Sequence, residues 1–372
     1  MEAKSRKAVG ATAIALAISL AIGVSAQVAA AQGGARKMEE QFKNIQVLNG
    51  APADMLNPTM VYFEGALGVG CPFCHDADGS KRDADTNPKK NVARKMVQMV
   101  NAINENTFNG EQVVTCMTCH QGRNKPIGVP FVVNEQAPPA MGEAYLDAMP
   151  SPAPIPNVTV DQLLNQYTAA LGGMDALQRT ASLKARGEMI QWRPARAFPA
   201  VPLEISAKAP GKQLIVSGSG EDASKEGYSG NAGWAGNRNM RRAELDGVRL
   251  EDAFNLPTQL KEILVSPKVD HPEVVEGREV YVVSASTQNL PLVKLYFDKD
   301  SGMLVRLMYH TQGLFGPYPT RIDYSNFREV NGRKVPYTWV ISGTRNREYT
   351  WVMRNVEAAS VDDGVFAKPA RQ

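Results

Sequence analysis

Two C-x-x-C-H motifs constrain this chain more than any other feature. They read Cys71-Pro-Phe-Cys74-His75 and Cys116-Met-Thr-Cys119-His120, and together they use all four cysteines of the 372-residue sequence. The spacing is typical of covalent haem attachment, in which both cysteine sulfurs form thioethers and the adjacent histidine binds iron. The motifs therefore predict two c-type haems, one on Cys71, Cys74 and His75, the other on Cys116, Cys119 and His120.

Two other readings of four cysteines are a pair of disulfides and a zinc site built from two C-x-x-C pairs. Neither explains why a histidine follows each pair directly. The chain has four histidines in all, and two of them occupy these positions. Haem attachment accounts for all six residues and is the reading that we prefer.

The first 31 residues have the pattern of an export signal. Lys4, Arg6 and Lys7 precede an apolar stretch over residues 11–24, and small residues follow, with cleavage expected after Ala26 or Ala31. An uncleaved membrane anchor is the alternative. We expect an exported, periplasmic protein, which suits haem-thioether chemistry. The formal net charge of +3 excludes the strongly basic class of nucleic-acid binders.

The chain divides into four predicted segments: a signal peptide (1–31), a dihaem domain (38–135), a Pro-rich linker (136–156) and a β-rich domain (157–372). Apolar periodicity predicts helices over residues 37–48, from Pro52 onward, and over 89–103. The predicted fold class is multidomain, an α-helical dihaem module followed by a mainly antiparallel, half-barrel-like β domain.

The β-rich domain carries clear local signals. Thr159 and Gln162 form a capping box at the start of a helix. Asn331-Gly332 separates two alternating apolar runs, which predicts a β-hairpin. Because no cysteine follows Cys119, we expect residues 157–372 to fold without haem.

Methionines are the candidate second axial ligands, since the remaining histidines, His271 and His310, lie beyond the linker. A Met ligand raises the potential relative to a second His. Met60 precedes the first motif and Met96 precedes the second, each on a predicted helix followed by a break. On spacing alone they stand equal to Met55 and Met99, and core packing is the alternative for each.

Charged residues near the motifs allow further readings. The acidic stretch over 76–90 lacks the spacing of a calcium loop and is predicted to be a solvated loop. Arg94, Lys95, Arg123 and Lys125 are candidate partners of haem propionates, with plain surface solvation as the alternative.

Four segments of the helical part occur together, and in the same order, in one family. They are Phe42-Lys-Asn-Ile-Gln-Val-Leu48, Gly70-Cys-Pro-Phe-Cys-His75, Val92-Ala-Arg-Lys-Met96-Val-Gln-Met99 and Val114-Thr-Cys-Met-Thr-Cys-His-Gln-Gly122. On these segments, residues 41–130 resemble the cytochrome c subunit of photosynthetic reaction centres. The resemblance implies that Met60 and Met96 are the distal ligands and that Met99 packs around the haem.

The chain also departs from that family. Family members carry four haems in two pairs, whereas this chain has one pair, and it lacks the histidine that serves another haem. The rest of the chain resembles lipoprotein-carrier half-barrels, on Val160-Asp-Gln-Leu-Leu-x-x-Tyr167, Leu171-Gly-Gly173 and the run from Tyr324 to Tyr337.

These features favour an electron carrier, not an enzyme, that relays single electrons between redox proteins. One alternative is a dihaem peroxidase-like enzyme, which needs an iron with a vacant or displaceable ligand. The other is an envelope protein whose β domain binds lipid, quinone or a membrane surface while the haem part serves as a tether. A large apolar pocket would favour the last reading.

Overall fold

The structure is a computed structural model that describes residues 36–126, 153–193, 196–343 and 348–369. The predicted signal peptide and most of the predicted linker lie outside these residues. We call residues 36–126 the helical region and residues 153–369 the β region. None of the described helices is long and apolar enough to cross a membrane.

The helical region contains two longer helices, each followed by a C-x-x-C-H motif. Helix α2 is capped at its C-terminus by Gly68 and helix α3 by Asn109, and both capping residues adopt a left-handed conformation. The helix, turn and motif pattern expected from the sequence is therefore present twice. The elements are α1 (Met38–Gln41), η1 (Ala53–Met55), α2 (Leu56–Leu67), η2 (Cys71–Phe73), η3 (Gly79–Lys81), α3 (Pro88–Phe108) and α4 (Cys116–His120).

The helix predicted over residues 37–48 is wrong, because only Met38–Gln41 is helical there. Phe42 is extended, and Asn44 takes a left-handed conformation with φ of 58°. The Asn44 amide donates to Asp83 O and to Asp85 Oδ1, on the loop that follows the first motif. Long-range hydrogen bonds thus replace the helical ones that the apolar spacing suggested.

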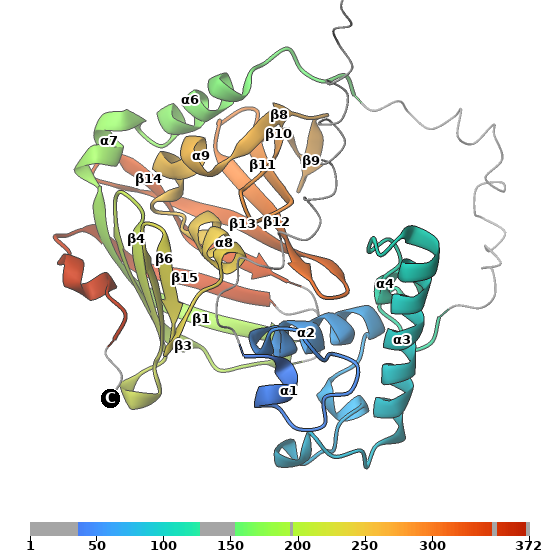
Figure 1. Ribbon diagram of the computed structural model, residues 1–372. Helices are drawn as coiled ribbons and strands as arrows, with labels where there is room; N and C mark the ends of the chain where they lie inside the picture. Colours follow the sequence, from blue (N-terminus) through green and yellow to red (C-terminus); the bar gives the residue numbers. More distant parts are fainter. Residues whose placement is uncertain (1–35, 127–152, 194–195, 344–347, 370–372) are drawn as a thin grey trace, which may run out of the picture.

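The β region is one antiparallel sheet flanked by helices, which confirms the predicted fold class (Figure 1). Its strand order is β7-β6-β5-β4-β3-β1-β15-β14-β13-β12-β11-β10-β8, with β2 beside β1 and β9 beside β10. The strands are β1 (Ser182–Arg193), β2 (Arg196–Ala197), β3 (Val201–Lys208), β4 (Lys212–Ser217), β5 (Ser224–Ser229), β6 (Ala232–Ala235), β7 (Arg238–Asn239), β8 (Val265–Val269), β9 (Glu273–Val275), β10 (Arg278–Ser286), β11 (Leu292–Asp298), β12 (Leu304–Gly313), β13 (Gly316–Val330), β14 (Arg333–Ser342) and β15 (Glu348–Ala358).

Helices α8 and α9 fill the inner face of this sheet. Leu250, Phe254 and Leu260 are buried in the same apolar cluster as Leu307 and Trp339 of the strands. The remaining elements of the β region are α6 (Val160–Ala170), α7 (Gly173–Arg179), η4 (Gly220–Asp222), α8 (Arg242–Glu251), α9 (Leu256–Ile263) and η5 (Asp363–Phe366).

Two local predictions for the β region are confirmed. Thr159 and Gln162 form the predicted capping box at the start of α6. Asn331 and Gly332, with φ of 49° and 83°, join β13 to β14. Both positive angles match the tight hairpin turn that this dipeptide favours.

The two regions touch directly. Arg241, at the start of α8, forms an ion pair of 3.0 Å with Asp54 of the helical region. The turn between β12 and β13 reaches α2, where Phe315 is buried among residues of the helical region. In Figure 1 this hairpin points at α2 and α4.

A buried carboxyl group in the β region makes its stability depend on pH. Tyr309 Oη on β12 donates a hydrogen bond to Glu251 Oε1 on α8. Burial raises the pKa of Glu251 from 4.5 to about 7. The folded protein then holds this proton more tightly than the unfolded chain, so the free energy of unfolding falls as pH rises from about 4.5 to 7.

We expect Glu251→Gln to remove this part of the pH dependence. The neutral amide resembles the protonated carboxyl, and its carbonyl oxygen still accepts from Tyr309. Urea midpoints of both proteins between pH 4.5 and 8 test this: the variant gains on the wild type as pH rises. A constant difference across the range would contradict the assignment.

Candidate haem-binding site

The two motifs occupy short helical turns. The first starts in η2, and its His75 N–H donates to Cys71 O over 3.0 Å. The second forms α4, with Thr115 as its N-cap and a reciprocal bond from Thr115 N–H to Thr118 Oγ1 of 3.0 Å. In each motif the two cysteines and the histidine therefore lie on one helical turn.

No disulfide joins Cys71, Cys74, Cys116 and Cys119 in this structure. Burial raises the pKa of the Cys74 and Cys116 thiols. No group of three or more potential metal ligands among His, Cys, Asp and Glu comes together in the described part of the chain.

Both motif histidines are oriented in the same way. His75 Nδ1 lies 2.8 Å from Arg82 O, and His120 Nδ1 lies 2.9 Å from Arg123 O. A carbonyl oxygen can only accept, so Nδ1 carries the proton in each ring and Nε2 keeps its lone pair. Histidine ligands of metals are commonly held by such a bond, which fixes the tautomer and raises the basicity of the ligating nitrogen.

The loop that carries the Arg82 carbonyl is anchored to α3. Lys90 Nζ donates to the carbonyls of Arg82, Asp83 and Ala84 over 3.1, 2.7 and 2.9 Å. Arg94 pairs with Asp85 over 2.9 Å. The Arg94 guanidinium, with the amide of Asn44, holds the pKa of Asp85 well below its usual range. Arg94, which the sequence suggested as a partner of haem propionates, thus pairs with this acidic loop in the structure.

The candidate methionines differ in burial. Met55 is only 7% exposed and belongs to the core of the helical region, whereas Met60 on α2 is partly buried against that core. Met96 and Met99 on α3 are 37% and 44% exposed. Met55 therefore serves packing, while both α3 methionines are accessible to a ligand.

Helix α3 presents two different apolar faces. Val97 and Val100 are buried, whereas Val92, Met96 and Met99 line an exposed stripe, and Met117 of the second motif is also exposed. Exposed apolar side chains on the helix that joins two Cys-Cys-His sets suit a large, flat, apolar cofactor. The donor chemistry and this stripe both fit haem.

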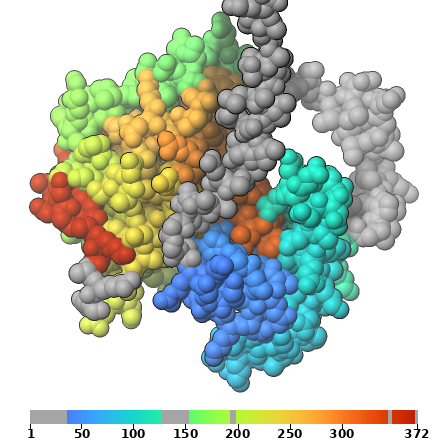
Figure 2. Space-filling model, viewed as in Figure 1, coloured from blue at the N-terminus to red at the C-terminus, as the bar shows by residue number. Residues whose placement is uncertain are grey.

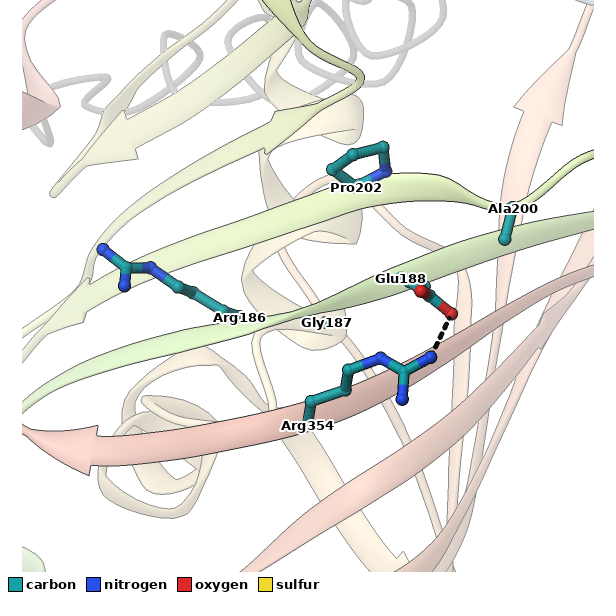
Figure 3. Close-up of a pocket in the computed structure, with 6 residues that line it drawn as sticks. All are labelled: Arg186, Gly187, Glu188, Ala200, Pro202 and Arg354. Carbon is teal, nitrogen blue, oxygen red and sulfur yellow. Dashed lines mark hydrogen bonds and ion pairs between the residues drawn. The ribbon is translucent and has the colours of Figure 1, made fainter.

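The two best-formed hollows of the β region are not large apolar pockets. One has a volume of about 290 Å³ and lies on the solvent face of β1, at the β-bulge between Arg186 and Gly187 (Figure 3). Glu188 and Arg354 form an ion pair of 2.9 Å across it. The other lies between Tyr167 and Tyr324 and has about 10 Å³ of free room, enough for a single water at most. Neither supports the lipid or quinone site that the sequence suggested.

Comparison with known sequences gives a partial match. Residues 6–167 match the family described as "Photosynthetic reaction centre cytochrome C subunit". The subunit of that name from Roseobacter denitrificans is 29% identical over 150 residues, covering 37% of this chain and 40% of the relative. Cytochrome c-554 of Chloroflexus aurantiacus is 37% identical over 83 residues, covering 21% of this chain and 20% of the relative. The predicted resemblance of the helical part is confirmed, and the chain spans less than half the length of these relatives.

Comparison with solved structures gives partial matches of low sequence identity. A LolA superfamily protein from Nitrosomonas europaea covers 57% of this chain and 98% of its own, with a TM-score of 0.42 and 12% identity. A putative outer membrane lipoprotein-sorting domain from Vibrio parahaemolyticus covers 55% and 94%, with a TM-score of 0.42 and 10% identity.

Sequence reasoning missed the residues that the β region places beside the motifs. Leu314 and Phe315 lie between Gly313 and Gly316 at the turn from β12 to β13. Two large apolar residues between glycines in a tight turn are unusual for a solvent-facing tip. That pattern could have indicated a buried contact.

Removing the anchor of the acidic loop should loosen the loop without unfolding α3. In Lys90→Ala the carbonyls of residues 82–84 lose their shared donor, so amide exchange at Ala84 should accelerate. Lys95→Ala, an exposed change on the same helix, is the matched control and should leave exchange as in the wild type. Hydrogen exchange with mass spectrometry measures both. Equal exchange in the two variants would show that Lys90 does not hold the loop.

Proposed function

We propose that the helical region binds two c-type haems and that the chain is an exported electron carrier. Cys71 and Cys74 attach the first haem, and Cys116 and Cys119 attach the second. A bound haem supplies an iron that gains and loses one electron. The domain limits proposed from the sequence, 38–135 for haem binding and 157–372 for the β domain, go with this assignment.

The observation that carries the proposal is the orientation of both histidines. His75 and His120 each donate Nδ1–H to a backbone carbonyl at nearly the same distance. In the neutral ring this bond leaves Nε2 unprotonated and able to bind iron. Two independent segments with the same cysteine pair and the same histidine tautomer favour two equivalent haem sites.

Methionine as the second ligand favours electron transfer over peroxide chemistry. Met60 and Met96 each lie on the helix before their motif, Met60 partly buried and Met96 37% exposed. An iron with both axial positions filled changes little on oxidation and offers no place for peroxide. His271 and His310 belong to the β region, and His271 Nδ1 donates to Ala153 O over 2.7 Å. This arrangement supports the carrier over the dihaem peroxidase alternative.

The partners that we propose are redox proteins of the periplasm. The relatives named above are cytochromes, and the family match over residues 6–167 includes both motifs. Export and haem thioether formation belong to the same oxidising side of the membrane.

The first test is haem stoichiometry. The intact mass of the exported protein should exceed that of the polypeptide by two haems, and no thiol should react with an alkylating reagent. Cys71→Ala with Cys74→Ala should remove one haem and leave the other. Free thiols or bound zinc in the mature protein would refute the proposal.

The second test identifies the distal ligands. Met60→His and Met96→His should each keep a low-spin haem but lower one reduction potential, because His replaces Met. Met55→Leu and Met99→Leu are the matched controls and should leave both haems low-spin. Spectropotentiometric titration measures spin state and potential together. A high-spin haem in Met99→Leu, but not in Met96→Leu, would move the ligand one helical turn along α3.

A further inference from the structure

The turn between β12 and β13 enters the helical region. We call residues 312–318 the hairpin tip. Phe315 at its end is only 5% exposed, although it lies at a turn. In Figure 2 the orange surface of the β region meets the blue surface of α1 and α2 and the teal surface of α3 and α4.

The hairpin tip shares one apolar cluster with candidate haem-binding residues. The buried members other than Phe315 all come from the helical region: Met38, Leu48, Met55, Tyr62, Ala66 and Val97. Met60, the proposed ligand of the first haem, and Cys116, the proposed attachment residue of the second, pack against this cluster. Phe315 is therefore the buried contribution of the β region to the cluster beside both sites.

One side of the hairpin tip holds α2. The ring centroids of Phe315 and Phe63 are 5.3 Å apart, and those of Tyr318 and Tyr62 are 6.3 Å apart. Tyr62 and Phe63 lie two and three residues after Met60 on α2. Aromatic pairs at these separations are favourable beyond the area that they bury. The tip thus fixes α2 close to the proposed ligand.

The other side of the hairpin tip holds the segment before the second motif. A Cβ at Gly316 would lie 2.9 Å from Thr115 Cγ2 and 3.1 Å from Tyr62 Oη, so only glycine allows this approach. Gln112 Nε2 donates to Leu314 O, and Gln312 Nε2 donates to Gln112 Oε1 over 2.7 Å. Thr115 is the N-cap of α4 and precedes Cys116.

We propose that the hairpin tip is a positioning element for the haem sites, with Phe315 as its central residue. It holds the helix that carries Met60 against the segment that carries Cys116. The need for it follows from size, because α2 has 12 residues and α4 has five. Helices this short are marginal without tertiary packing. This inference rests on the proposed function, and it makes the β region part of the cytochrome instead of a separate module.

The experiment compares the full-length exported protein with Phe315→Ala. The variant should retain two covalent haems, since its cysteines are unchanged. The charge-transfer band of Met–iron ligation should disappear on heating at a midpoint about 10 °C below the wild-type value, because a large buried ring is lost. At least one reduction potential should fall, since looser methionine ligation and entry of water both stabilise the oxidised iron. Phe315→Leu, which keeps an apolar side chain, should shift both readouts less, in the same direction, and serves if Phe315→Ala fails to mature.

Two control variants separate positioning from general destabilisation. Phe366→Ala removes an equally buried ring from η5, in the β region and outside the cluster. Arg241→Ala breaks a different contact between the regions, the ion pair with Asp54 and the hydrogen bond to Met55 Sδ, and keeps every residue of the hairpin tip. Both should leave the haem potentials unchanged.

The outcomes distinguish this inference from the proposed function. A wild-type protein without haem would refute the proposed function itself. Two haems in every variant, with potentials and band midpoints that Phe315→Ala and Phe315→Leu leave as in the wild type, would overturn the positioning inference alone. Equal shifts in Phe315→Ala and Phe366→Ala would also overturn it, because the effect would then reflect only the stability of the β region.

Discussion

The helical region depends on one close backbone approach, between the end of α2 and the end of α4. Gly122 N–H donates to Ala66 O over 2.9 Å. A Cβ at Gly68 would lie 2.0 Å from Gly122 O, and Gly68 has a φ of 64°, so both space and backbone angle require glycine there. This contact joins the helix of Met60 to the second C-x-x-C-H motif. The two proposed haem sites therefore belong to one packed unit and are not independent of each other.

The packing of the helical region also holds the two backbone carbonyls that accept hydrogen bonds from His75 and His120. Arg82 O is held by Lys90 from α3, and Arg123 O follows directly after the Gly122 contact. A carbonyl that cannot move keeps the imidazole in one tautomer and one orientation. Rigid ligands keep the energy of rearrangement on electron transfer low, which is the requirement that the proposed function places on the fold.

Local signals in the sequence predicted much of this arrangement. The Thr159 capping box and the Asn331-Gly332 turn act over a few residues, so their chemistry is visible in the sequence alone. The six residues of the two motifs were likewise identified by spacing. The helix over 37–48 failed because Asn44 bonds to a loop some forty residues away, which local apolar spacing cannot register. Apolar spacing did not separate Met55 from Met60, whereas packing places Met55 in the core and Met60 at its edge.

The contact between the helical region and the β region could not be predicted from the sequence. A Pro-rich linker suggested independent modules, yet Phe315 lies about 200 residues beyond the second motif in sequence and is buried beside it. The apolar cluster around Phe315 is small. On α3, the stripe of Val92, Met96 and Met99 stays exposed. Small regions gain proportionately little from their own cores. A ring supplied by the β region and two haems against the exposed stripe would each add apolar area to this core. On that argument, the proposed haems and the docked hairpin tip would both enlarge the core of the helical region, so each would favour the other.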